Sequence, residues 1–118
     1  MVKNLTKLAP TFGEHIEIVA MESPHGAILD WWRRLDLALH EHFELCHNRP
    51  ARNRRELEEH IANYPKLGYE FSREIVTLRH HRNTIAHEDV CFLSKEDAIS
   101  YARDAFDALG TVTLAWPK

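Results

Sequence analysis

Apolar residues recur every three or four positions along most of the chain, the spacing that places side chains on one face of an α-helix. The longest of these stripes runs from Ile28 to Phe43, and another runs from Phe71 to Ile85. Short stretches rich in proline, glycine and asparagine separate the stripes. The pattern predicts helices over residues 12–22, 27–47, 54–63, 69–87 and 95–109.

Signals for helix ends lie at the boundaries between these segments. Residues 48–50 read Asn-Arg-Pro, and proline cannot continue a helix because it lacks the backbone donor. Asn53 with Glu56, and Ser94 with Asp97, have the spacing of a helix N-cap whose side chain accepts a backbone hydrogen bond. We therefore expect helices to begin directly after Asn53 and after Ser94.

The last predicted helix has an inward face made mostly of small residues, which lets a neighbouring helix approach closely. We expect this helix to end at Leu109, with Gly110 in the left-handed conformation that glycine adopts at helix C-termini. The tail that follows alternates apolar and polar residues, a pattern compatible with an extended segment or with further helix. The residues expected to face inward are Ala98, Ala102, Ala105, Phe106 and Leu109.

Together these segments predict an all-α protein, an antiparallel bundle of four main helices and one short helix. A chain of 118 residues fits a single domain, here residues 1–118. Within it, we expect residues 1–11 to form a loosely held arm and residues 111–118 to form a C-terminal tail.

Two features depart from simple apolar stripes. Trp31 and Trp32 are adjacent, so we expect only one of them in the core and the other in a second interface, such as a dimer seam, or at an exposed edge. Arg82 lies within the stripe from Phe71 to Ile85, where an apolar residue would complete the seam. Such a break is expected at a functional site, and also where a helix end meets a subunit interface.

Composition narrows the class of protein. Apolar residues make up 44% of the chain, enough for one core without a cross-link or a metal, and the formal net charge of −3 confines any nucleic-acid surface to a local patch. Cys46 and Cys91 belong to no C-x-x-C motif, which indicates reduced, half-buried thiols of a cytoplasmic protein. No stretch has the character of a signal peptide or a membrane span.

The end of the helix predicted over residues 69–87 is dense in cationic and titratable side chains. Residues 82–87 read R-N-T-I-A-H, and this R-N-x-x-A-H pattern resembles the signature of HEPN domains, a family of small helical bundles. Arginine and histidine with four to six residues between them occur six times in this chain. The last pair, Arg82 and His87, is distinct because Asn83 follows the arginine and Ala86 precedes the histidine. The pair also ends the helix predicted over residues 69–87.

The resemblance covers roughly residues 27–109 and implies a metal-independent endoribonuclease with Arg82, Asn83 and His87 as catalytic residues. Histidine titrates near neutral pH, so it can take the proton of the RNA 2′-hydroxyl or protonate the 5′ oxygen. Arg82 would stabilise the negative charge of the transition state, and Asn83 would bind the phosphate or hold its neighbours in place. The reaction uses an acid and a base, whereas one motif supplies one histidine, so we expect a homodimer that joins two motifs.

Family members with this motif act in toxin–antitoxin, anti-phage and RNA-processing systems, so the expected partners are RNA and a cognate antitoxin protein. The candidate RNA-binding residues lie beside the motif and in an arginine-rich stretch at the start of the helix predicted over residues 54–63. A solvated surface is the alternative interpretation of both groups. They are Arg79, His80 and His81, and Arg52, Arg54 and Arg55.

The sequence also raises the question of a metal site. His40, His42 and His47 lie close together with Cys46 among them, but positions 40 and 42 point to different sides of a helix, so one ion does not easily bind both. We expect no metal site and no cofactor. The alternative to an enzyme is a non-catalytic helical module that dimerises or binds a nucleotide or a partner protein.

Overall fold

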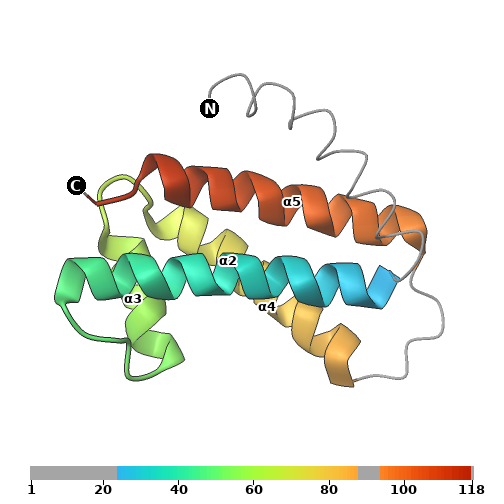
Figure 1. Ribbon diagram of the computed structural model, residues 1–118, viewed down its shortest axis with the longest axis horizontal. Coiled ribbons are helices and arrows are strands. Elements are labelled where there is room, and N and C mark those ends of the chain that lie inside the picture. Colours follow the sequence, from blue (N-terminus) through green and yellow to red (C-terminus); the bar gives the residue numbers. More distant parts are fainter. Residues whose placement is uncertain (1–23, 88–93, 118) are drawn as a thin grey trace, which may run out of the picture.

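The computed structural model describes residues 24–87 and 94–117, which form four helices and contain no strand. Helix α2 spans Pro24–His47, α3 spans Arg54–Asn63, α4 spans Tyr69–His87 and α5 spans Lys95–Leu114 (Figure 1). The all-α class is confirmed, as are the predicted helices from the second onward. The helix predicted over residues 12–22 and the arm predicted over residues 1–11 lie outside the described residues. A membrane-spanning segment is not found among the four described helices.

Helix α2 is buried from two directions. Trp31 packs edge-to-face on Phe106 of α5, with ring centroids 5.9 Å apart. The guanidinium of Arg54 from α3 lies 5.7 Å from the ring centroid of Trp32. Both tryptophans are therefore buried, at 3% and 6% exposure, and the prediction that only one of them faces the core is wrong. Adjacent residues both fit inside because different helices cover the two sides of α2.

Helices α2 and α5 lie side by side and run in the same direction (Figure 1). His42 contacts the backbone of Ala115 at the C-terminal ends of both helices, while Trp31 contacts Phe106 further back. Helix α4 runs opposite to both. This pairing differs from the expected antiparallel bundle because α3 has only 10 residues and does not traverse the molecule, so that α4 makes the return instead.

Helix α5 continues past its predicted end. Val112 and Ala115 are buried and extend the stripe of Ala105 and Ala108 at intervals of three and four residues. Gly110 therefore lies inside the helix, and the predicted left-handed cap at this residue is wrong. Glycine inside a helix costs roughly 1 kcal/mol relative to alanine. Burial of a valine side chain contributes about 1.5 kcal/mol or more, so packing decides where the helix ends.

The inward face of α5 is made of alanines. Ala98, Ala102 and Ala105 are fully buried, as predicted. Leu109 is partly buried, and Phe106 is 43% exposed although its ring contacts α2. The prediction that Phe106 faces inward is therefore wrong, because alanines at the centre of the interface bring the two helices close and leave the larger ring at its edge.

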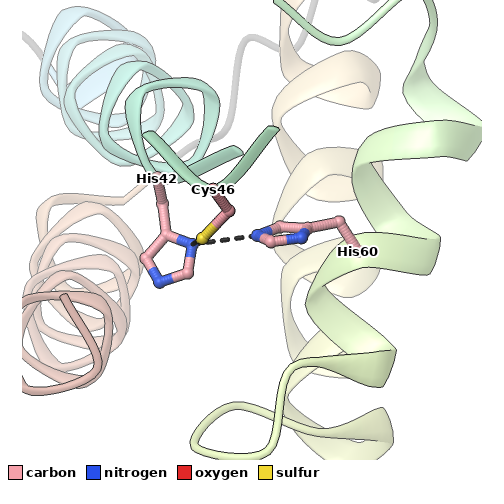
Figure 2. Close-up of side chains that lie close together, drawn as sticks. All are labelled: His42, Cys46 and His60. Carbon is pink, nitrogen blue, oxygen red and sulfur yellow. Dashed lines mark hydrogen bonds between the residues drawn. The ribbon is translucent and has the colours of Figure 1, made fainter. Parts of the chain in front are cut away.

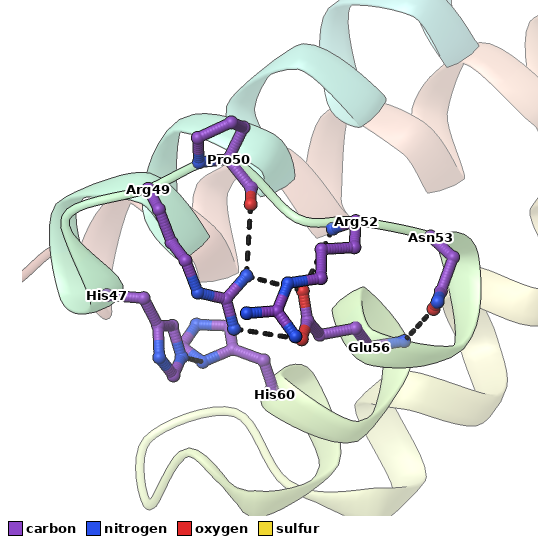
Figure 3. Close-up of polar contacts among 7 residues, drawn as sticks. All are labelled: His47, Arg49, Pro50, Arg52, Asn53, Glu56 and His60. Carbon is purple, nitrogen blue, oxygen red and sulfur yellow. Dashed lines mark hydrogen bonds and ion pairs between the residues drawn. The ribbon is translucent and has the colours of Figure 1, made fainter.

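The predicted caps are confirmed. The Asn53 side chain accepts a hydrogen bond from the backbone N–H of Glu56 at 2.8 Å, and the Ser94 hydroxyl accepts one from Asp97 at 3.0 Å. Glu56 also joins the loop between α2 and α3 to the start of α3, as Figure 3 shows. Its two carboxylate oxygens accept hydrogen bonds from the Arg49 guanidinium at 2.7 and 2.9 Å. The backbone N–H of Arg52 donates to the same carboxylate at 2.9 Å.

These contacts lower the pKa of Glu56 to about 2, chiefly through the hydrogen bonds from Arg49 and then through the N–H of Arg52. Because this folded-state pKa lies below the ordinary value of 4.5, the carboxylate stabilises the fold above pH 4.5. That stabilisation is lost as the pH falls from 4.5 through 2. We predict that the free energy of unfolding of Glu56→Gln falls less than that of the wild type as the pH is lowered from 4.5 to about 2. Urea unfolding of both proteins across this pH range measures the difference.

The matched control for this prediction is Glu59→Gln. Glu59 pairs with Arg55 at 3.1 Å, but both side chains are largely exposed, so this variant is expected to keep the acid dependence of the wild type. Equal acid dependence in Glu56→Gln and the wild type would contradict the role assigned to the Arg49–Glu56 contact.

Candidate functional site

Arg82 occupies the apolar face of α4 near the C-terminal end of the helix. The other residues of this face, Phe71, Ile75 and Leu78, are buried. Arg82 itself is partly buried. Nη1 of Arg82 donates a hydrogen bond to Oδ1 of Asn83 at 3.1 Å. Its Nε is buried and has no hydrogen-bond partner among the described residues. A buried donor without a partner costs free energy, so this cation is held in the seam at a cost to stability.

The charge of Arg82 is not neutralised by a carboxylate in the described ranges. Arg79, one turn earlier, lies 3.8 Å from the carboxylate of Glu58, whereas Arg82 forms no ion pair there. Its charge does reach Tyr101 on α5: burial raises the pKa of this hydroxyl, and the nearby guanidinium of Arg82 partly opposes that rise. Tyr101 donates a hydrogen bond to the carbonyl of Leu78 at 2.8 Å, which fastens α4 to α5 one turn before the motif. Among the described residues, Arg82 therefore has an amide partner and no carboxylate partner.

The structure brings two of the three predicted catalytic residues together. Arg82 and Asn83 are in contact. His87 is the last residue of α4, but its side chain lies outside the description, as does Glu88. His80 and His81 are exposed on the preceding turn of α4. The described part of the motif is thus a guanidinium and an amide with two solvent-exposed imidazoles beside them.

Most of the predicted RNA-binding arginines are engaged within the protein. Arg54 donates to Asp36 of α2 at 2.9 Å, and Arg55 pairs with Glu59 one turn later at 3.1 Å. Arg52 differs, since it donates its backbone N–H to Glu56 while its side chain is exposed. Of these three arginines, only Arg54 joins α3 to another described helix through its side chain. RNA binding by Arg52, Arg54 and Arg55 stays a prediction.

Acidic residues line the surface between α4 and α5. One hollow of about 470 Å³ is bordered by Glu74, Asp104 and Asp107. A second hollow of about 310 Å³, next to the motif, is bordered by His81, Asp97 and Asp104. Carboxylates repel phosphate, so the acidic border of these hollows disfavours an anionic ligand between α4 and α5.

Three histidines form a chain between α2, α3 and the end of α5. The C-terminal ends of α2 and α5 lie on the side of the molecule opposite the C-terminal end of α4 (Figure 1). Nε2 of His42 is 2.9 Å from the carbonyl oxygen of Ala115, so it carries the proton and donates. With neutral rings, His42 Nδ1 then accepts from His60 Nε2 at 2.9 Å. His60 Nδ1 in turn accepts from His47 Nε2 at 3.0 Å (Figure 3).

The environment keeps the middle ring of this chain uncharged. Burial lowers the pKa of His60 to about 4, and the neighbouring imidazoles of His42 and His47 add to this effect. His42 itself is 1% exposed, with the ring of Tyr64 edge-on at 4.5 Å. Cys46 Sγ lies 3.9 Å from Nδ1 of His42 and is exposed rather than half-buried as predicted. Cys91 lies outside the described residues.

His60 is the residue of this group that the sequence did not indicate. The sequence groups a different set of potential metal ligands, which are close to one another along the chain: His40, His42, Cys46 and His47. His40 points elsewhere, toward Asp36 at 3.6 Å, while His60 is 18 residues from His42 and arrives on another helix. The available signal was His42, which lies on the apolar stripe of α2. An imidazole buried on such a stripe needs polar partners.

Comparisons of the chain with models of known protein families, with curated proteins and with solved structures found no match.

We predict that Arg82→Met raises the free energy of unfolding by about 1 kcal/mol. The substitution removes a buried donor that has no partner among the described residues, and it completes the apolar face of α4. Urea unfolding of the two proteins at neutral pH measures the difference.

Arg79→Met is the matched control for this prediction. Arg79 also has a buried Nε without a hydrogen-bond partner among the described residues. Replacement of Arg79, however, leaves the partly buried carboxylate of Glu58 without its ion-pair partner. This variant should therefore be less stable than the wild type. A loss of stability in Arg82→Met as well would mean that the Arg82 guanidinium supports the fold.

Proposed function

We propose that this protein is a metal-independent endoribonuclease of the HEPN type that acts in the cytoplasm. The observation that carries the proposal is the state of Arg82, a partly buried cation with an unsatisfied Nε and no carboxylate partner among the described residues. A phosphate would supply the missing partner. The R-N-x-x-A-H pattern adds His87 as a proton carrier at the end of the same helix.

The proposed reaction is an internal transfer within RNA. The 2′-oxygen attacks the adjacent phosphorus, the bond from phosphorus to the 5′ oxygen breaks, and the proton lost by the 2′-hydroxyl is matched by one delivered to the 5′ oxygen. Arg82 stabilises the negative charge that develops on the phosphorus-bound oxygens. Asn83 accepts a hydrogen bond from Arg82 through its carbonyl oxygen, which orients the guanidinium. The Asn83 amide nitrogen remains as a possible donor to phosphate.

Two copies of the motif would supply both proton carriers. His87 of one protomer would act as the base and His87 of the second as the acid, with two arginines facing the phosphate. The carboxylates that border the hollows between α4 and α5 disfavour RNA on that side of the motif. RNA is the proposed substrate, and a cognate antitoxin protein is a further proposed partner if the enzyme is a toxin.

A second candidate function is a non-catalytic module that dimerises or binds a nucleotide or a partner protein. The internal ion pairs of Arg54, Arg55 and Arg79 favour it, since they leave fewer cations for an RNA backbone. The acidic hollows between α4 and α5 point the same way. Both functions use the same end of α4, and only catalysis requires the histidine.

We predict that the purified protein cuts a single-stranded RNA but not DNA of the same sequence, because only RNA carries the 2′-hydroxyl. The products should end in a 2′,3′-cyclic phosphate and a 5′-hydroxyl, and EDTA should not slow the reaction. His87→Ala should abolish cleavage, and Arg82→Ala should slow it roughly a hundred- to thousand-fold. Asn83→Ala should have a smaller effect. Single-turnover rates and end-group analysis of the products measure these outcomes.

His40→Ala is the control for this prediction. His40 follows two arginines at the spacing of the bare motif, yet it lies beside Asp36 on α2 and outside the candidate site. Its loss should leave cleavage unchanged, with folding of every variant checked by circular dichroism. Cleavage by His87→Ala at the wild-type rate would rule out the proposed chemistry and leave the non-catalytic module.

We also predict a homodimer in solution, because one motif supplies one histidine and the reaction uses two proton carriers. Light scattering should give twice the chain mass of 13.8 kDa. A mixture of Arg82→Ala and His87→Ala proteins tests the shared site, since a mixed dimer that needs residues from both protomers responds differently from either parent. A chain that remains monomeric at high concentration would exclude the two-motif arrangement.

A further inference from the structure

His42, Cys46 and His60 bring three metal-ligating atoms together at the end of the molecule opposite the motif. Figure 2 shows the two imidazole rings, one from α2 and one from α3, directed toward each other with the Cys46 sulfur beside them. Nδ1 of His42 lies 2.9 Å from Nε2 of His60 and 3.9 Å from Sγ of Cys46. All three ligating atoms lie within 4.8 Å of one another.

The two separations measured from Nδ1 of His42 are close to those of a tetrahedral site. Bonds of about 2.0–2.1 Å to nitrogen and 2.3 Å to sulfur place the ligating atoms about 3.3–3.6 Å apart. The two nitrogens must open by a few tenths of an ångström. The sulfur must approach His42 by a similar amount and must also approach His60, because separations within the cluster extend up to 4.8 Å. Cys46 is exposed in the last turns of α2, so its side chain has room to make this adjustment.

The surrounding contacts orient the rings as a metal requires. The Ala115 carbonyl takes the Nε2 proton of His42, which leaves the Nδ1 lone pair directed at His60 and Cys46. Nε2 of His47 lies 3.0 Å from Nδ1 of His60, so it can accept a hydrogen bond from a protonated Nδ1 when Nε2 of His60 binds an ion. Such second contacts fix the tautomer of a ligating histidine and raise its basicity.

We propose that His42, Cys46 and His60 bind one divalent transition-metal ion, with Zn²⁺ as the first candidate. Two imidazoles and one thiolate suit Zn²⁺ and its neighbours, and they exclude Mg²⁺ and Ca²⁺, which take oxygen ligands. Cys46 and His60 both border a groove of about 420 Å³, so the fourth coordination position faces this groove and takes a water molecule. On binding, the Cys46 thiol releases its proton to solvent. The His60 proton passes from Nε2 to Nδ1, and the His47 proton passes from Nε2 to Nδ1.

The ion would tie the end of α2 to α3 and, through the His42–Ala115 contact, to the end of α5. The three ligands belong to α2 and α3. The C-terminal ends of α2 and α5 lie on the side of the molecule opposite the C-terminal end of α4, which carries the Arg82 motif (Figure 1). The site is therefore independent of the proposed cleavage reaction, which is expected to continue when a chelator has removed the ion.

Co²⁺ titration of the reduced, chelator-treated full chain tests this proposal. A thiolate ligand gives a sulfur-to-cobalt charge-transfer band in the near ultraviolet, and a tetrahedral site gives intense visible bands. We expect both signals to saturate at one Co²⁺ per chain and to disappear when Zn²⁺ displaces the cobalt. Zn²⁺ should also raise the melting temperature, because it binds the folded state.

Variants assign the ligands, and the chain offers matched controls. Cys46→Ser should lose the charge-transfer band, while Cys91→Ser, at the other cysteine, should keep it. His60→Gln should weaken Co²⁺ binding more than tenfold, whereas His40→Gln on the same helix as His42 should not. His47→Gln removes a contact to a ligand and should weaken binding about tenfold.

Cys46→Ser tests the proposal even if a histidine variant fails to fold. Cys46 is exposed, so its replacement by serine is expected to leave the fold intact. Absence of the charge-transfer band in the wild type would overturn the proposal and leave the histidines as a hydrogen-bonded network. A band that persists in Cys46→Ser but vanishes in Cys91→Ser would overturn it as well. A Zn²⁺-induced rise in melting temperature that is equal in Cys46→Ser and the wild type would do the same.

Discussion

The two-sided burial of α2 is the constraint on which the described structure depends. Leu35, Leu39 and Phe43 are almost completely buried, and the flanking residues Trp31 and Trp32 widen the buried face to both sides. One neighbouring helix cannot cover so broad a face. Helix α5 therefore runs along one side, where its alanines permit a close approach, while α3 and α4 close the other. The parallel course of α2 and α5 follows, and it brings the end of α5 to His42.

Charged residues in this fold fall into two groups. Several arginines have carboxylate partners on another helix or loop, as Arg49 does with Glu56 and Arg54 with Asp36. Arg82 lies in an apolar seam with an amide as its hydrogen-bond partner and a buried Nε that the described residues leave unsatisfied. A fold selected for stability alone would place an apolar residue there, which is why the proposed function centres on this side chain.

The two candidate sites depend on tertiary structure to different degrees. Arg82 and Asn83 are neighbours on one helix, so their contact is local and needs only the helix to form. The His42–His60 pair joins two helices, and the Ala115 carbonyl joins a third, so that site exists only in the folded chain. A metal bound there would accordingly be coupled to folding.

The sequence by itself determined the helical segments from residue 27 onward, because a period of 3.6 residues and the caps at Asn53 and Ser94 are local properties of the chain. Helix α2 begins at Pro24, three residues before its predicted start. The sequence also drew attention to Arg82, since a cation in an apolar stripe is visible without coordinates. Tertiary structure decided the rest. Helix α5 passes through Gly110 because the residues beyond it are buried against other helices. Arg54 finds Asp36 at a distance of 18 residues, and His42 finds Ala115 at a distance of 73. Periodicity within one segment carries no information about such partners, because the packing of separate helices brings them together.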